Sequence, residues 1–260
     1  MCSRWCSPGA APGFAFEAFW LEFDAKDLQR RFPQPGIAFL YVAAAAQRSL
    51  DATIADAIER TLPILVGRSL DDRLAGAIAM CVGAVTPRSA LSHFGVALAR
   101  GGSEIRVCFR LPLDAIAPNL AALGLGSMAH LAADILAPLD DSCRVTLQIA
   151  LTPAVAPRLG LEISSASPVG WKTILACLLA RNLCTREEAS AIVRWTSDAG
   201  SNGLPGPRVE ADRLPHDPIT FAKATLWRVP SHVKITVSAD HQISAKAYLF
   251  AGAAWPATVD

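Results

Sequence analysis

Lys246 and Tyr248 are the residues of this chain whose types and spacing most directly suggest a ligand site. They alternate with Ala245 and Ala247, so on a β-strand their side chains share one face. Lys234 lies on a strand-like segment just upstream, and a short turn can bring it to the same face. We interpret these residues as ligand contacts rather than as catalysts.

A second pair of polar residues with useful spacing is Arg106 and Arg110. They lie four residues apart in an alternating segment, so they point the same way at a separation of about 13 Å. Guanidinium groups bind carboxylates or phosphates through two hydrogen bonds. The alternative is that both are ordinary solvent-facing charges.

No complete catalytic motif is present in the sequence. It has no Gly-x-Ser-x-Gly elbow, no P-loop, and no Gly-x-Gly-x-x-Gly pattern after a strand. His93, His232 and His241 lie at predicted hairpin edges without a partner at a recognisable spacing. We interpret them as surface or turn histidines.

Metal ligation is also not indicated by the sequence. The pairs Asp71-Asp72 and Asp140-Asp141 each precede or open an element, where an aspartate caps backbone N–H groups. Cys2 and Cys6 lack a second ligand pair for zinc. We therefore predict no metal and no cofactor.

The bulk composition is that of a folded protein of 260 residues, with 52% hydrophobic residues, 18% charged residues and a net charge of +1. This balance argues against disorder and gives no electrostatic case for nucleic acid. No apolar run is long enough to span a bilayer, so no membrane association is predicted. Residues 1–14 resemble a disordered leader more than a signal peptide. Apolar surroundings of the cysteines favour reduced thiols and a cytoplasmic location.

Alternation of apolar and polar residues predicts four β-hairpins, with helical segments between them. The predicted strands are Phe19–Phe23 with Gly36–Val42, His93–Ala99 with Glu104–Arg110, Arg144–Leu151 with Arg158–Ser164, and Ser231–Ser238 with Ile243–Phe250. The predicted helices are Ser49–Val66, Leu70–Val85, Leu113–Leu123, Ser127–Leu136, Pro168–Leu183 and one that begins with the capping box Thr185–Glu188. We predict a single α+β domain over 15–260 with one curved antiparallel sheet or partial barrel, helices outside, and a surface loop at 198–218.

Each predicted strand has an apolar face, which must pack on helices, and a polar face opposite. The apolar face includes Phe19, Leu21 and Phe23 in the first strand and Val233, Ile235 and Val237 near the end. The polar face is either solvated or lines a ligand-binding lumen. On the second interpretation, the ligand contacts are Arg106, Arg110, Gln148, Glu162, Lys234, Lys246 and Tyr248.

The repeated helix–strand–strand units and the strand Ala245-Lys246-Ala247-Tyr248-Leu249 resemble the aromatic and indole prenyltransferases. That resemblance implies an antiparallel barrel ringed by helices, with Lys246 and Tyr248 holding a prenyl diphosphate. The chain departs from the family in having only two tyrosines, Tyr41 and Tyr248, and no second Lys-x-Tyr strand. These departures leave few groups to shield a carbocation.

Three further segments are similar to the peptide-binding accessory proteins of crocagin-type ribosomal peptide pathways. They are Phe19-Trp20-Leu21-Glu22-Phe23-Asp24, Arg158-Leu159-Gly160-Leu161-Glu162, and Ser231-His232-Val233-Lys234 with the strand that follows it. This resemblance implies a protein that binds and presents a precursor peptide without chemistry. The implied partners are that peptide or a peptide-modifying enzyme, with a homodimer as a further possibility.

Overall fold

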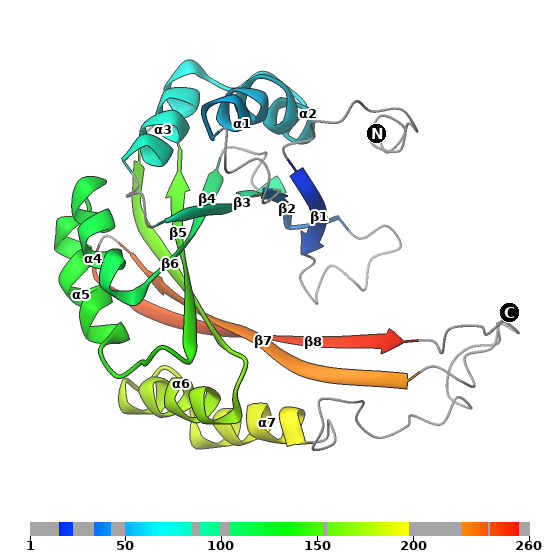
Figure 1. Cartoon of the computed structure of the whole chain (residues 1–260), viewed down its shortest axis with the longest axis vertical. Coiled ribbons are helices and arrows are strands. Elements are labelled where there is room, and N and C mark those ends of the chain that lie inside the picture. Colours follow the sequence, from blue (N-terminus) through cyan, green and yellow to red (C-terminus); the bar gives the residue numbers. More distant parts are fainter. Residues whose placement is uncertain are drawn as a thin grey trace, which may run out of the picture. The chain divides into compact units, whose positions relative to one another are not determined.

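The eight strands form one antiparallel sheet whose strand order follows the sequence from β1 to β8 (Figure 1). The computed structural model describes residues 16–22, 34–42, 50–84, 89–98, 104–152, 155–197, 225–238 and 240–254. The predicted leader at 1–14 and the predicted loop at 198–218 lie outside these residues. The predicted α+β class is confirmed.

The elements alternate between pairs of strands and groups of helices, in the order predicted from the sequence. The strands are β1 Phe16–Glu22, β2 Ile37–Val42, β3 Ala90–Val96, β4 Ile105–Leu111, β5 Cys143–Leu151, β6 Val155–Ser165, β7 Thr225–Val237 and β8 Ile243–Ala254. The helices are α1 Leu50–Asp56, the π-helical turn η3 Ala57–Thr61, α2 Leu62–Val66, α3 Asp72–Gly83, α4 Leu113–Ala122, α5 Gly126–Leu136, α6 Pro168–Ala180 and α7 Arg186–Ser197. None of the helices in the described ranges has the length and apolar character needed to cross a membrane.

The chain divides into two compact units. Unit 1 comprises Met1–Ala137, Arg144–Leu161 and Val237–Gln242, and unit 2 comprises Pro138–Cys143, Glu162–Thr236 and Ile243–Asp260. The single domain over 15–260 therefore stays a prediction.

In unit 1 the core lies between one face of the sheet and its helices. Alternate residues of β2 to β5 point to this face and are fully or almost fully buried: Ala38, Leu40, Phe94, Val107, Phe109, Leu147 and Ile149. Helix α2 packs on β3 and α3 packs on β4. Figure 1 shows these helices on one side of the strands. The period-two alternation of the sequence thus sets which face is apolar, as predicted.

In unit 2, α6 and α7 pack on each other and carry buried apolar residues such as Ile174, Leu178 and Ile192. Helix α6 starts where the Ser167 side chain accepts a hydrogen bond from the Gly170 N–H at 3.0 Å, with Pro168 at the first helical position. The indole N–H of Trp171 donates to the Ser165 carbonyl at 2.9 Å and ties the helix to the end of β6. Ile163, Val233 and Ile235 are buried in the sheet of this unit.

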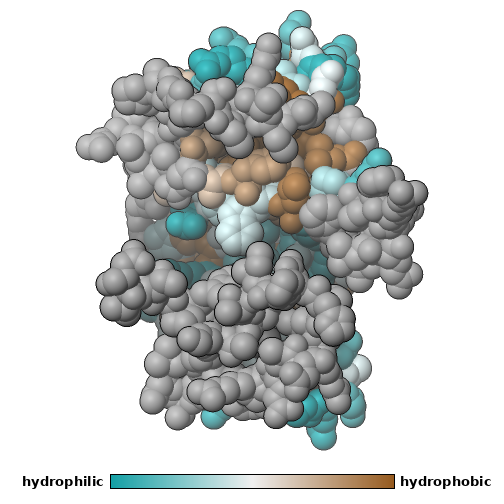
Figure 2. Space-filling view, turned by 90° about the vertical axis from the view of Figure 1, so that its right-hand side faces the viewer, coloured by the Kyte–Doolittle hydropathy of each residue, from teal (hydrophilic) through white to brown (hydrophobic). Residues whose placement is uncertain are grey.

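One predicted apolar surface is wrong. Phe19 and Leu21 of β1 were expected to pack on helices, but they are 48% and 43% exposed, and Trp20 between them is 53% exposed. Ala38 and Leu40, which pair with Leu21 and Phe19 from the neighbouring β2, are fully buried, whereas β1 lies at the edge of the sheet. Figure 2 shows hydrophobic residues, in brown, reaching the surface in the part of the molecule that contains β1.

Gly170 provides a test of the packing at the start of α6. A Cβ at this position would lie 2.7 Å from both Ser142 Oγ and Ser165 Cβ, so Gly170→Ala should lower the free energy of unfolding by about 1–3 kcal/mol. Gly76, within α3, has no atom within 4 Å of an added Cβ. Gly76→Ala should therefore raise stability by about 0.5–1 kcal/mol. Urea unfolding followed by tryptophan fluorescence measures both, and equal stability of the two variants would contradict this packing.

Candidate functional site

In unit 1, a row of polar and aromatic side chains crosses the sheet on the face turned away from the helices. The pairs in register are Tyr41 with His93, His93 with Cys108, and Cys108 with Gln148. Gln148 is only 3% exposed and donates a hydrogen bond from its amide to Cys108 Sγ at 3.5 Å. The predicted ligand contact Gln148 is therefore a buried polar member of this row.

His93 is the centre of an aromatic group in the same row. Its ring lies 4.7 Å from the Tyr41 ring and 5.5 Å from the Phe39 ring, and its Nδ1 lies 3.1 Å from Ser92 Oγ. The interpretation of His93 as a surface histidine is wrong, since it is 4% exposed. β3 is an internal strand, and the apolar run Phe94-Gly95-Val96 beside His93 is the signal for this.

A charged group in unit 1 consists of Glu104 and the two arginines that contact it. Its carboxylate accepts from Arg106 Nε at 2.9 Å and from the Arg158 guanidinium. Sequence reasoning identified Arg106 but missed Glu104 and Arg158. Glu104 stands two residues before Arg106, and therefore on the same face, which is the signal that was available.

The charge of this group favours one kind of ligand atom. Two guanidinium groups and one carboxylate leave a net charge of one positive, in a place where Glu104 and Arg106 are largely withdrawn from water. Such a group can bind one further carboxylate or carbonyl oxygen, to which the guanidinium N–H groups donate hydrogen bonds. Arg110, four residues further along the face of β4, is exposed to solvent.

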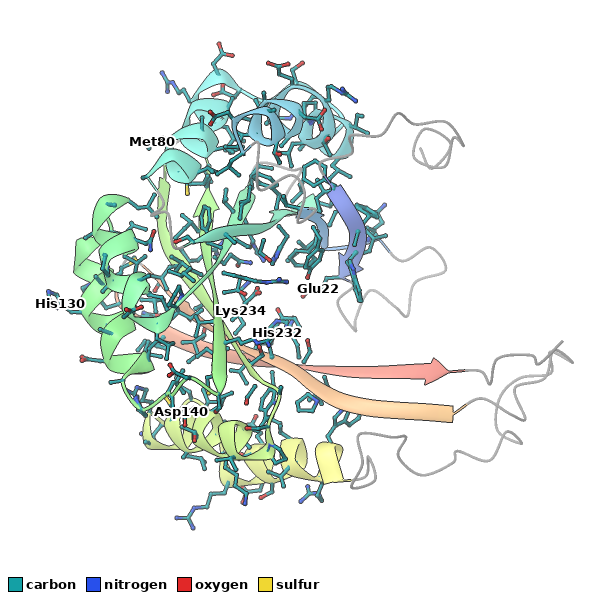
Figure 3. All side chains as sticks on the ribbon, in the orientation of Figure 1. Glu22, Met80, His130, Asp140, His232 and Lys234 are labelled. Carbon is teal, nitrogen blue, oxygen red and sulfur yellow. The ribbon has the colours of Figure 1, made fainter. Side chains whose placement is uncertain are left out.

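In unit 2, an ion pair joins the polar faces of β6 and β7. Lys234 Nζ lies 3.5 Å from Glu162 Oε1, and Lys234 is 9% exposed. The sequence predicted both residues as ligand contacts, and the structure brings them together. Figure 3 shows Lys234 and His232 on the side of β7 that is turned away from α6 and α7.

The terminal hairpin adds an aromatic group to the polar face of unit 2. The rings of His232 and Tyr248 stack at 4.4 Å with an interplanar angle of 15°, and Lys246 Nζ lies 4.6 Å from the centre of the Tyr248 ring. Ser231 Oγ lies 3.0 Å from His232 Nδ1. Lys246 and Tyr248 thus share a face as predicted, and His232 is the member that sequence reasoning missed.

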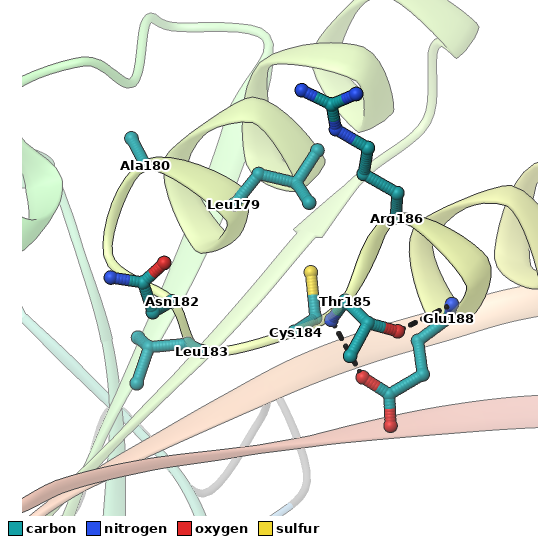
Figure 4. A pocket seen from close by; sticks show the side chains of 8 residues that line it. All are labelled: Leu179, Ala180, Asn182, Leu183, Cys184, Thr185, Arg186 and Glu188. Carbon is teal, nitrogen blue, oxygen red and sulfur yellow. Dashed lines mark hydrogen bonds between the residues drawn. The ribbon is translucent and has the colours of Figure 1, made fainter.

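In the described part of unit 2, two hollows are lined by residues of α6, α7 and the turn between them. One, of about 230 Å³, is lined by Leu178, Leu183, Cys184, Glu188, Ala191, Ile192, Val233, Ala245, Lys246 and Ala247. The other, of about 720 Å³, opens at the turn between α6 and α7 (Figure 4). Its wall contains the predicted capping box: Thr185 N–H donates to Glu188 Oε2 at 2.8 Å, and Glu188 N–H donates to Thr185 Oγ1 at 3.1 Å. These contacts stabilise the start of α7, so the residues of this turn have a structural role.

One aspartate of each pair acts as the sequence predicted. Asp71 caps α3 by accepting from the Arg73 N–H at 2.8 Å. Asp140 accepts from the Ser142 N–H at 2.9 Å, and the hydrogen bonds from Ser142 lower the pKa of the Asp140 carboxyl. Within the described part of the chain, no cluster of three or more histidine, cysteine, aspartate or glutamate residues is arranged to hold a metal ion.

The cysteines also have a packing role. Cys81, Cys108, Cys143 and Cys177 are buried thiols, as expected for small hydrophobic side chains. Burial raises the pKa of the Cys81 thiol to about 12, so this thiol stays protonated at neutral pH.

No protein-family model, curated protein or solved structure matches this chain. Function must therefore be inferred from the residues of the two polar faces and from their contacts. Those faces combine paired charges with aromatic rings, an arrangement suited to binding.

The ion pair of unit 2 can be tested by its contribution to stability. Glu162→Gln leaves the largely buried ammonium of Lys234 without its carboxylate, so it should cost about 3 kcal/mol of unfolding free energy. Replacing both residues by methionine should restore much of that loss. Arg60→Met, which breaks the exposed pair with Asp56, is the control and should cost about 0.5 kcal/mol or less. A Glu162→Gln effect no larger than that of Arg60→Met in urea unfolding would contradict a buried pair.

Proposed function

We propose that the chain binds an extended precursor peptide and presents it, without chemical change, to enzymes of a ribosomal peptide natural-product pathway. The observation that carries the proposal is that three cations of the polar faces already lie against carboxylates. Lys234 contacts Glu162, while Arg106 and Arg158 contact Glu104. A surface that carries charges of both signs suits a peptide, whose backbone offers neutral amides and whose side chains carry both signs.

The aromatic residues of the two faces support the same proposal. Tyrosine, tryptophan and arginine are enriched at the centres of protein–peptide contacts, because they bury a large area while keeping a polar group. Tyr41 and Trp20 in unit 1, whose rings lie 6.4 Å apart, and Tyr248 in unit 2 are side chains of this kind. Each face therefore offers apolar contact area next to hydrogen-bonding groups.

The strand segments that resemble crocagin-type accessory proteins contain several of these residues. Trp20 and Glu22 lie in the first segment, Arg158 and Glu162 in the second, and Lys234 in the third. That resemblance supports a precursor peptide, or an enzyme that modifies it, as the partner. The buried thiols fit a reducing compartment, and we place the binding in the cytoplasm.

Prenyl transfer is the second candidate, and the contact of Lys246 with Tyr248 favours it. Lysine and tyrosine alternate on β8 as in the Lys-x-Tyr strands that hold a prenyl diphosphate. A diphosphate needs several cations, however, and the ammonium of Lys234 is engaged by Glu162. Peptide binding therefore accounts for more of the described contacts.

Calorimetric titration of the chain with the precursor peptides encoded beside its gene tests the proposal. One of them should give saturable heat at a stoichiometry near one. Tyr248→Ala should weaken that binding by about tenfold, because it removes a stacked aromatic contact. Met80→Ala, at an exposed position of α3, is the matched control and should leave it unchanged.

The same titration separates the two candidate functions. Absence of heat with every neighbouring peptide would contradict peptide binding. Saturable binding of dimethylallyl or geranyl diphosphate that is lost in Lys246→Ala would favour the transferase instead.

A further inference from the structure

Arg110 of β4 and Arg144 of β5 lie near each other on the polar face of unit 1. Arg110 is the register partner of Thr146, so these two side chains share a face, and Arg144 stands two residues before Thr146 on that same face. The Cα atoms of such a diagonal pair lie about 7–8 Å apart, within reach of two long side chains. Both arginines are exposed, and the structure describes the chain without a break from 104 to 152 around them.

The two arginines differ from Arg106, Arg158 and Lys234, each of which contacts a glutamate. In the described part of the chain, no hydrogen bond or ion pair engages the guanidinium of Arg110 or of Arg144. Like charges on paired strands are destabilising, whereas opposite charges stabilise the pair. The sheet therefore holds two like charges together at a place where an anion would stabilise them.

The spacing of the two arginines fits acidic side chains that alternate along an extended peptide. Residues i and i+2 of a strand point the same way and lie about 6.6–6.8 Å apart, which is close to the diagonal separation of the arginines. Each guanidinium can bind one carboxylate through two hydrogen bonds, and the hydroxyl of Thr146 beside them can donate another. A single carboxylate would leave one of the two positive charges without a partner.

We propose that Arg110, Arg144 and Thr146 bind an acidic motif of the precursor peptide, made of two acidic residues separated by one other residue. The inference rests on the proposed function, since it gives the bound peptide a sequence feature and a place. The next pair of residues along the same face is Cys108 with Gln148, and both are buried. The bound motif thus lies one pair of residues from the buried polar row of this face.

The test compares two synthetic peptides of the same composition, with amidated C-termini and a neutral BODIPY label. The first, Gly-Ser-Glu-Thr-Glu-Ser-Gly, has alternate glutamates, and the second, Gly-Ser-Glu-Glu-Thr-Ser-Gly, has adjacent ones. Fluorescence anisotropy is measured at low ionic strength, where exposed charges are screened least. We expect saturable binding of the first peptide and about fivefold weaker binding of the second, because adjacent side chains of an extended peptide point to opposite faces.

Variants of the chain locate the contact. Arg110→Gln combined with Arg144→Gln should weaken binding of the first peptide by about tenfold, because both charge-assisted contacts are lost. Arg68→Gln combined with Arg73→Gln removes the same charge from exposed positions before and within α3, and should change binding by less than about twofold. Because all four arginines are exposed, the two double variants should unfold at similar urea concentrations.

The variant Arg144→Glu provides a measurement that needs no peptide. It places a carboxylate diagonal to Arg110, so it should raise the urea midpoint above that of Arg144→Gln and abolish binding of the acidic peptide. A midpoint below that of Arg144→Gln would show that Arg144 already faces a carboxylate, and would contradict the site.

Three further results would overturn the acidic-motif site. Equal binding of the two peptides would reject the match in spacing, and unchanged binding in the Arg110→Gln, Arg144→Gln variant would place the contact elsewhere. Inorganic phosphate that binds these arginines more tightly than the peptide does would assign them a phosphate ligand. Failure of the acidic peptide to bind, in a chain that still gives calorimetric heat with a precursor peptide, would also reject the site without rejecting the proposed function.

Discussion

Burial of one face of each internal strand against helices is the constraint on which the other features of this protein depend. Side chains such as Leu147 and Ile149 are almost completely withdrawn from water, and each contributes about 1.5–3 kcal/mol. Because side chains alternate along a strand, fixing these residues on the helix side sends Gln148 and its neighbours to the other side. A slip of one residue in register would exchange the two faces of a strand. The same strand register therefore determines both the core and the polar site.

On the polar faces that result, cations lie against carboxylates. Glu104 and Glu162 each stand where a buried cation needs a partner, since an isolated ammonium or guanidinium away from water is costly. The same carboxylates weaken any attraction for phosphate groups. A face built in this way favours a ligand that offers amides, aromatic rings and charges of both signs, which describes a peptide better than a diphosphate.

Local sequence patterns predicted the helices and strands well. The contacts that they did not predict form between residues that are far apart in the sequence. Alternation and helix caps are encoded within a few residues, so the four hairpins and the Thr185–Glu188 capping box could be predicted from the sequence. The contact of Arg158 with Glu104 spans 54 positions, and the stack of His232 on Tyr248 depends on the register of a hairpin. The exposure of Phe19 depends on how far the helix layer reaches, which alternation alone does not encode.

Binding without chemistry is tested most directly by recovering the peptide after contact with the chain. A stoichiometric mixture of the chain and its neighbouring precursor peptide would be separated by size exclusion, and the peptide in the complex weighed by intact mass spectrometry. If the chain binds the peptide without chemistry, the peptide should co-elute with the chain and keep its starting mass. A shifted peptide mass, such as the gain of a prenyl group when the diphosphate is supplied, or elution of the peptide apart from the chain would contradict it.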